Sequence, residues 1–107
     1  MESKTGIQYD IIQITQQYSD EYLLHLMQEE SAELIQAINK WIRFLNAGEY
    51  TGHGAEILSH LYEEIADNEI LIQSIKNRFA CENEVYDWKK KKLKRWKERQ
   101  GTTQNPK

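Results

Sequence analysis

The chain has 107 residues and a formal net charge of −3, with 39% hydrophobic and 29% charged residues. These values are ordinary for a soluble globular domain, and the length suffices for one modest core but not for two. A single cysteine, Cys81, excludes an intramolecular disulfide framework and fits a reducing compartment. The first residues lead into no apolar signal region and no stretch approaches the length of a membrane span, so we expect a cytoplasmic protein.

The first half of the chain predicts two helices. Residues 1–6 are expected to be disordered, and apolar residues at helical spacing predict a short first helix over 7–18. Ser19 reads as an N-cap with acidic residues behind it, so a second helix should run over 20–46. Three glycines within seven residues oppose regular structure, and we expect a loop over 47–54.

The second half predicts two more helices. The third should run over 55–79, followed by a short turn at 81–83 and a fourth helix over 84–100. The polar tail, residues 101–107, is expected to be disordered. No strand pattern and no internal repeat is present. The fold class is therefore all-α, most simply a four-helix arrangement over residues 7–100 with a short first helix.

A glutamate interrupts the apolar stripe of the second helix. On a helical wheel Glu30 falls in the middle of this stripe, Glu33 lies at its edge, and Glu29 points outside it. A carboxylate that faces a core is costly unless a proton, a cation or a metal compensates it. The stripe itself consists of Leu23, Met27, Leu34, Ile38, Trp41 and Leu45.

The third helix carries a second acidic pair. Glu64 is expected on one flank of its apolar stripe, Asp67 lies further round the same side, and Asn68 falls inside the stripe. Residues three apart are neighbours on a helix, so each acidic pair can present oxygens to one ion. The stripe consists of Ile57, Leu61, Ile65, Ile72, Ile75 and Phe79.

Four converging carboxylates would repel one another strongly without a cation. Mg²⁺, Mn²⁺ and Ca²⁺ prefer oxygen ligands, whereas di-iron helix bundles use Glu-x-x-His pairs, which this sequence lacks. We therefore predict a Mg²⁺ site, with Mn²⁺ as a substitute. The alternative is that the Glu-x-x-Glu spacing belongs to a solvated helix surface.

The fourth helix is basic, since eight of the fourteen Lys and Arg residues lie between Lys89 and Arg99. On its wheel Lys92 falls between Trp88 and Trp96 on the face expected to point inward, and Arg95 flanks that face. A lysine on an aromatic face needs an anionic partner, which a carboxylate or a phosphate supplies. The alternative is a lysine whose stem packs on the two tryptophans while its ammonium reaches solvent.

These motifs together resemble the all-α nucleoside triphosphate pyrophosphohydrolase superfamily, and within it the small MazG-like proteins. The resemblance covers about residues 20–100. It is carried by Glu30-x-x-Glu33, then Glu64-x-x-Asp67, then Lys92-Leu93-Lys94-Arg95, in this order on three helices. The sequence departs from the family pattern at Asn68, where relatives usually carry an apolar residue. Asn68 is interpreted either as a hydrogen-bonded core amide or as a contact to the base or sugar.

The resemblance implies Mg²⁺-dependent cleavage between the α- and β-phosphates of a nucleoside triphosphate, which gives a monophosphate and pyrophosphate in nucleotide-pool housecleaning. It implies that Glu30 or Glu33 activates water and that Lys92 and Arg95 contact the phosphates, with Arg99 and Lys40 as further candidates. It also implies a homodimer or homotetramer. A nucleic-acid partner is not expected, for the reasons of charge distribution given below. The metal ligands implied are Glu30, Glu33, Glu64 and Asp67.

A rival interpretation is a non-enzymatic helical module that binds DNA or RNA. The lysines of the fourth helix, with Trp88 and Trp96 among them, would contact phosphates and bases. Four consecutive lysines, however, spread around a helix rather than forming one face, and the rest of the chain is acidic. We therefore expect the pyrophosphohydrolase activity.

Overall fold

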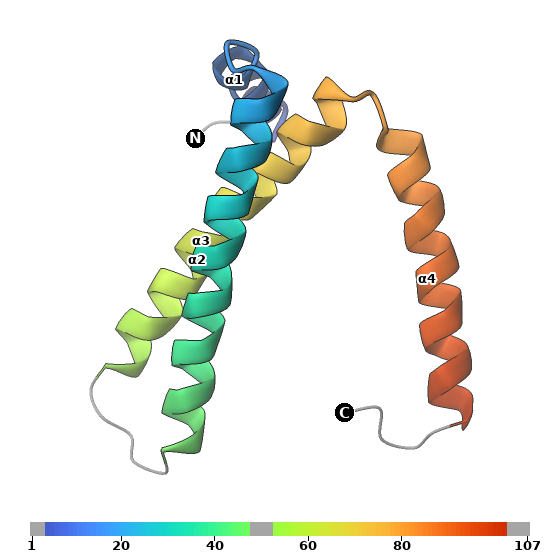
Figure 1. Ribbon diagram of the computed structural model, residues 1–107. Coiled ribbons are helices and arrows are strands. Elements are labelled where there is room, and N and C mark those ends of the chain that lie inside the picture. Colours follow the sequence, from blue (N-terminus) through green and yellow to red (C-terminus); the bar gives the residue numbers. More distant parts are fainter. Residues whose placement is uncertain (1–3, 48–52, 103–107) are drawn as a thin grey trace.

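The computed structural model describes residues 4–47 and 53–102. These residues form four helices and no strand, which confirms the all-α fold with a short first helix (Figure 1). None of the described helices combines the length and the hydropathy that crossing a membrane requires. The helices are α1 (Lys4–Thr15), α2 (Asp20–Asn46), α3 (Gly54–Arg78) and α4 (Glu82–Thr102).

The predicted second helix has the observed bounds of α2, because its start is encoded locally. The Ser19 hydroxyl accepts a hydrogen bond from the backbone N–H of Tyr22, at 3.0 Å, and two acidic residues occupy the first turn. By contrast, α1 begins at Lys4, so residues 4–6 are helical rather than disordered, and it ends at Thr15. The predicted disordered tail, 101–107, is wrong at its start, because α4 continues to Thr102. The predicted disorder of 1–3 and 103–107 lies outside the described residues, as does most of the predicted loop.

The helices α2 and α3 form an antiparallel pair that contains the core (Figure 1). Leu23, Ala37 and Leu71 are the buried apolar residues of the described chain, at 0%, 1% and 8% exposure. The start of α3 lies close to the end of α2, since a Cβ added at Gly54 would meet the Phe44 ring at 2.8 Å. Glycine therefore permits the close approach at the end of the pair where the chain passes from α2 to α3.

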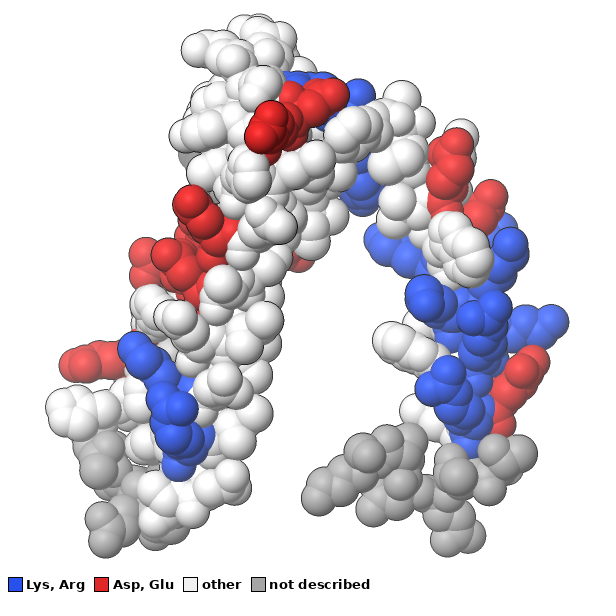
Figure 2. Space-filling view, viewed as in Figure 1, with Lys and Arg blue, Asp and Glu red and all other residues white. Residues whose placement is uncertain are grey.

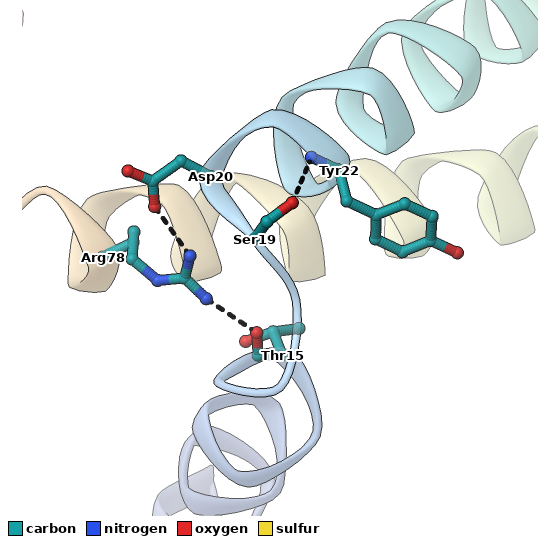
Figure 3. A network of polar contacts seen from close by, with 5 residues as sticks. All are labelled: Thr15, Ser19, Asp20, Tyr22 and Arg78. Atoms are coloured by element: carbon teal, nitrogen blue, oxygen red, sulfur yellow. Dashed lines mark hydrogen bonds and ion pairs between the residues drawn. The ribbon is translucent and has the colours of Figure 1, made fainter.

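Arg78, the last residue of α3, fastens α1 to the pair (Figure 3). Its guanidinium donates to the Asp20 carboxylate at 2.7 Å and to the backbone carbonyl of Thr15 at 2.8 Å. The Thr15 carbonyl, at the end of α1, also accepts a hydrogen bond from the backbone N–H of Tyr18, at 3.0 Å. One side chain thus holds the end of α1 and the start of α2 against α3.

The turn between α3 and α4 is a Schellman motif with alanine at the left-handed position. Ala80 has φ 51°, its N–H donates to the carbonyl of Asn77, and the N–H of Cys81 donates to the carbonyl of Lys76. Lys76 also pairs with Glu82 at 3.0 Å, which lowers the pKa of the Glu82 carboxyl by hydrogen bonding. These contacts determine the direction in which α4 extends from the α2–α3 pair.

Helix α4 stands apart from the α2–α3 pair (Figure 1), and residues 86–101 are all exposed. Trp88 and Trp96 are 53% and 54% exposed, so the prediction that their face points inward is wrong for the single chain. The radius of gyration is 17.5 Å, whereas a compact domain of this length has about 13 Å. A single chain therefore covers little of its own apolar surface.

Candidate metal centre

Three glutamates converge between α2 and α3. One oxygen each of Glu30, Glu33 and Glu64 lies within 4.8 Å of the other two. Glu30 and Glu33 are one turn apart on α2, and Glu64 comes from the facing helix α3. The spacing along α2 and the antiparallel packing of α3 together produce this cluster, which we call the acidic cluster.

The cluster lies partly inside the helix interface. Glu64 is 7% exposed and Glu30 is half-buried, whereas Glu33 is exposed at the edge. The buried face of α3 is therefore not centred on its apolar stripe, because Glu64, on the flank of that stripe, is buried together with Asn68 and Leu71. The cluster consequently has a buried end and an end open to solvent.

Burial and mutual repulsion both act on these carboxyls. Burial, together with the negative charges of Glu33 and Asp67, raises the pKa of Glu30 from 4.5 to about 7. Burial and the same two neighbours raise the pKa of Glu64, although nearby His60 opposes the shift. The cluster thus favours a proton or another cation near neutral pH.

Two oxygens of the cluster lack the partners that buried groups normally have. The Oε2 atoms of Glu30 and Glu64 are buried and accept no hydrogen bond from the described residues. The other oxygen of Glu64 lies 3.5 Å from Nε2 of His60, whose side chain is 47% exposed. Buried oxygens of native proteins are rarely left unpaired, so each of these two atoms can accept a proton, a water molecule or a metal cation.

Asn68 lies directly beside the cluster and joins the two helices. Its amide nitrogen donates to the backbone carbonyl of Glu30 at 2.9 Å and to that of Glu64 at 2.7 Å. Its amide oxygen accepts from the Ser31 hydroxyl at 3.3 Å. Asn68 is 5% exposed, and both polar ends of its amide are occupied within the fold. This settles the alternative in favour of the hydrogen-bonded core amide.

Asp67, the fourth predicted ligand, lies near the cluster but outside the set of converging oxygens. Its charge acts on both Glu30 and Glu64. It lines, with Glu30, a pocket of about 190 Å³ that the sequence did not reveal. The rest of the lining is mostly apolar and comes from all of the first three helices: Ile14, Thr15, Tyr18, Leu26, Ile70 and Leu71.

The predicted phosphate-contacting residues do not approach the acidic cluster within one chain. Lys92 and Arg95 are exposed on α4, which the turn at Ala80 directs away from α2. Figure 2 shows basic side chains along much of α4 and a group of acidic side chains on the α2–α3 pair, with a few charges of the opposite sign on each. Lys40 is likewise exposed, towards the end of α2.

Comparison with known proteins identifies no family. No family model, no curated protein and no solved structure matches the chain. The resemblance to MazG-like proteins accordingly depends on the order and spacing of the motifs described above.

The donor set fits a hard divalent cation. All ligand atoms of the cluster are carboxylate oxygens, which Mg²⁺, Mn²⁺ and Ca²⁺ prefer, and no cysteine or histidine completes the group of three. Neighbouring oxygens around Mg²⁺ lie roughly 3 to 4 Å apart, so closing the cluster requires shifts of at most about 2 Å. Rotation about the side-chain bonds of the exposed Glu33 can supply such a shift.

Proposed function

We propose that the protein is a Mg²⁺-dependent nucleoside triphosphate pyrophosphohydrolase that releases pyrophosphate and a nucleoside monophosphate. The observation that carries the proposal is the acidic cluster, in which Glu30, Glu33 and Glu64 converge. One oxygen of Glu30 and one of Glu64 are buried and have no hydrogen-bond partner among the described residues. The order of the motifs on three helices supports it independently of the geometry. Glu64 is only 7% exposed, whereas acidic residues that belong to a solvated helix surface are exposed to water.

The residues have distinct roles in this proposal. Glu30, Glu33 and Glu64 would hold the ion, and Asp67 would join them or bind one of its water ligands. When bound, Mg²⁺ neutralises phosphate charge and orients the α-phosphate. The oxygen of the attacking water forms a bond to the α-phosphorus, and Glu30 or Glu33 accepts the proton that this water releases. The bond from that phosphorus to the bridging oxygen breaks, and pyrophosphate leaves.

Lys92 and Arg95 would contact the phosphates from another copy of the chain. The accessible surface is 8856 Å², whereas a compact protein of 12.7 kDa exposes about 6,200 Å². Large apolar residues of every helix contribute to this excess, among them Ile12, Ile42 and Ile72. Burying these residues between copies as a homodimer or homotetramer would complete the core, and α4 then has a surface to pack against.

The test uses purified protein, Mg²⁺ and a panel of nucleoside and deoxynucleoside triphosphates, with pyrophosphate and monophosphate measured separately. We expect pyrophosphate rather than single phosphate, and a loss of about 100-fold or more in Glu30→Gln. Glu29→Gln is the matched control, since Glu29 is the exposed neighbour on the same helix. No turnover of any nucleotide, or equal turnover in Glu30→Gln, would refute the proposal.

A second candidate function is binding of DNA or RNA by α4. The observation in its favour is that Lys92, Trp88 and Trp96 are exposed on a helix that stands apart. A basic helix with exposed aromatic residues can contact phosphates and stack on bases. Tight binding that weakens steeply with salt, without nucleotide hydrolysis, would favour this function over the first.

A further inference from the structure

The amide of Asn68 joins the backbones of two residues whose side chains meet in the acidic cluster. Its nitrogen donates to Glu30 on α2, at 2.9 Å, and to Glu64 on its own helix, at 2.7 Å. The Ser31 hydroxyl, next to Glu30 on α2, donates to its oxygen at 3.3 Å. The same buried side chain therefore contacts both helices at the level of the cluster.

These contacts are sensitive to sliding of one helix along the other. A shift of one residue displaces a helix by about 1.5 Å, enough to break a hydrogen bond of ordinary length. The same shift would move Glu30 relative to Glu64 and separate oxygens that now lie within 4.8 Å. The register of α2 against α3 and the geometry of the cluster are thus coupled through Asn68.

An amide is a costly choice if packing alone were required at this position. Asn68 is 5% exposed on the buried face of α3, one turn before Leu71 on the same face. An apolar side chain here would bury more apolar surface and so stabilise the fold more. The amide stabilises it only by the net free energy of its hydrogen bonds, after the cost of removing its polar atoms from water is subtracted. The amide instead specifies one register of α2 against α3, because all of its hydrogen bonds can form only in that register.

We propose that Asn68 is a positioning residue that sets the α2–α3 register and so holds the carboxylates of Glu30 and Glu64 at the spacing required to bind a divalent cation. The proposal rests on the proposed function in so far as the acidic cluster binds Mg²⁺. Asn68 itself contacts neither the ion nor the substrate, since both polar ends of its amide are occupied.

The first test measures Mg²⁺ affinity by calorimetry without nucleotide, well below the melting temperature of each variant. We expect Asn68→Leu to weaken Mg²⁺ binding about 10-fold, the lower end of what residues behind metal ligands typically contribute. The control is Ser74→Ala, because Ser74 is 3% exposed on α3 but donates within its own helix, to the carbonyl of Ile70. A purely structural role would lower the melting temperature of Asn68→Leu and leave its affinity unchanged, which would overturn the proposal.

The second test measures the register directly, with spin labels at the exposed positions Gln36 on α2 and Glu69 on α3 in a Cys81→Ser background. We expect the distance distribution to broaden or shift in Asn68→Leu and to stay unchanged in Ser74→Ala. If Asn68→Leu does not fold, both tests are made with Asn68→Ala, which adds no bulk. Absence of Mg²⁺ binding in the unmodified chain would refute the proposed function. In that case the distance distribution still tests whether Asn68 sets the register of α2 against α3. An unchanged distribution in Asn68→Leu would overturn that role.

Discussion

Replacing Glu30 with glutamine should stabilise the metal-free protein at alkaline pH. The pKa of Glu30 rises from 4.5 in the unfolded chain to about 7 in the folded one, so the folded state binds more protons between these values. The free energy of unfolding therefore falls as the pH rises from about 4.5 to about 7, and the penalty is complete above that range. Glutamine keeps the shape of the side chain and removes the charge.

The magnitude follows from the shift. A rise of this size corresponds to at most about 3 to 4 kcal/mol. Because Glu30 is only half-buried and Glu33 is exposed, solvent screens part of the repulsion, and we expect about 1 to 2 kcal/mol. For a domain of this size that is about 4 to 8 °C in melting temperature.

The assay is urea unfolding followed by circular dichroism in EDTA, at about pH 5 and about pH 8. Glu30→Gln should exceed the unmodified chain in stability at the higher pH and approach it at the lower one. Glu29→Gln, on the exposed side of α2, should change neither value. Equal stability of Glu30→Gln and the unmodified chain at the higher pH would refute the electrostatic interpretation of the cluster.

Magnesium should reverse the order of the two proteins. At a concentration one hundred times its dissociation constant, Mg²⁺ stabilises a binding-competent fold by about 2.7 kcal/mol, which exceeds the difference of about 1 to 2 kcal/mol expected between the two metal-free proteins. The unmodified chain should gain this stability at about pH 8, while Glu30→Gln, which lacks one ligand, should gain little. An equal gain in both proteins would place the ion elsewhere.

Three further predictions concern other parts of the molecule. Ala80→Gly should stabilise the protein by about 1 kcal/mol in the same urea assay, because glycine adopts φ 51° without the penalty of a Cβ; a loss of stability would contradict this. Arg78→Ala should cost about 1 to 2 kcal/mol and speed hydrogen exchange of the α1 amides, since it removes the bonds to Asp20 and to the Thr15 carbonyl; unchanged exchange would show that α1 is held otherwise. Lys92→Gln should raise the KM for nucleotide and leave Mg²⁺ affinity without nucleotide unchanged, and an unaltered KM would remove Lys92 from the phosphate site.

The helices were predictable because their signals are local. Ser19 and the acidic residues behind it mark the start of α2, and the apolar spacing identifies α3 almost to its ends. Spacing also brought Glu30 and Glu33 together correctly, since neighbours on one helix need no tertiary information.

Which face of α3 packs inside the chain was not predictable from apolar spacing. Ile65 and Ile72 dominate the apolar stripe, yet they are 39% and 46% exposed, while Glu64 and Asn68 are buried. Periodicity identifies the most apolar face but does not say whether that face packs within the chain. Ala37 was missed for a related reason, because alanine adds little hydrophobicity even where its small size lets two helices approach.

The position of α4 depends on a turn without a sequence signal. A left-handed residue after a helix is usually glycine, and here it is Ala80. The wheel of α4 gives the angular order of its residues around the helix axis, but it contains nothing about where the helix points, and residues 86–101 are all exposed.

That turn makes α4 a lever. Its 21 residues span about 30 Å from a pivot of three residues, so a rotation of roughly 10° at Ala80 displaces the far end by about 5 Å. Such a displacement matches the length of a lysine side chain. Small backbone adjustments at one alanine therefore decide how far the cationic groups of this helix can reach, while the α2–α3 pair that holds the carboxylates stays as it is.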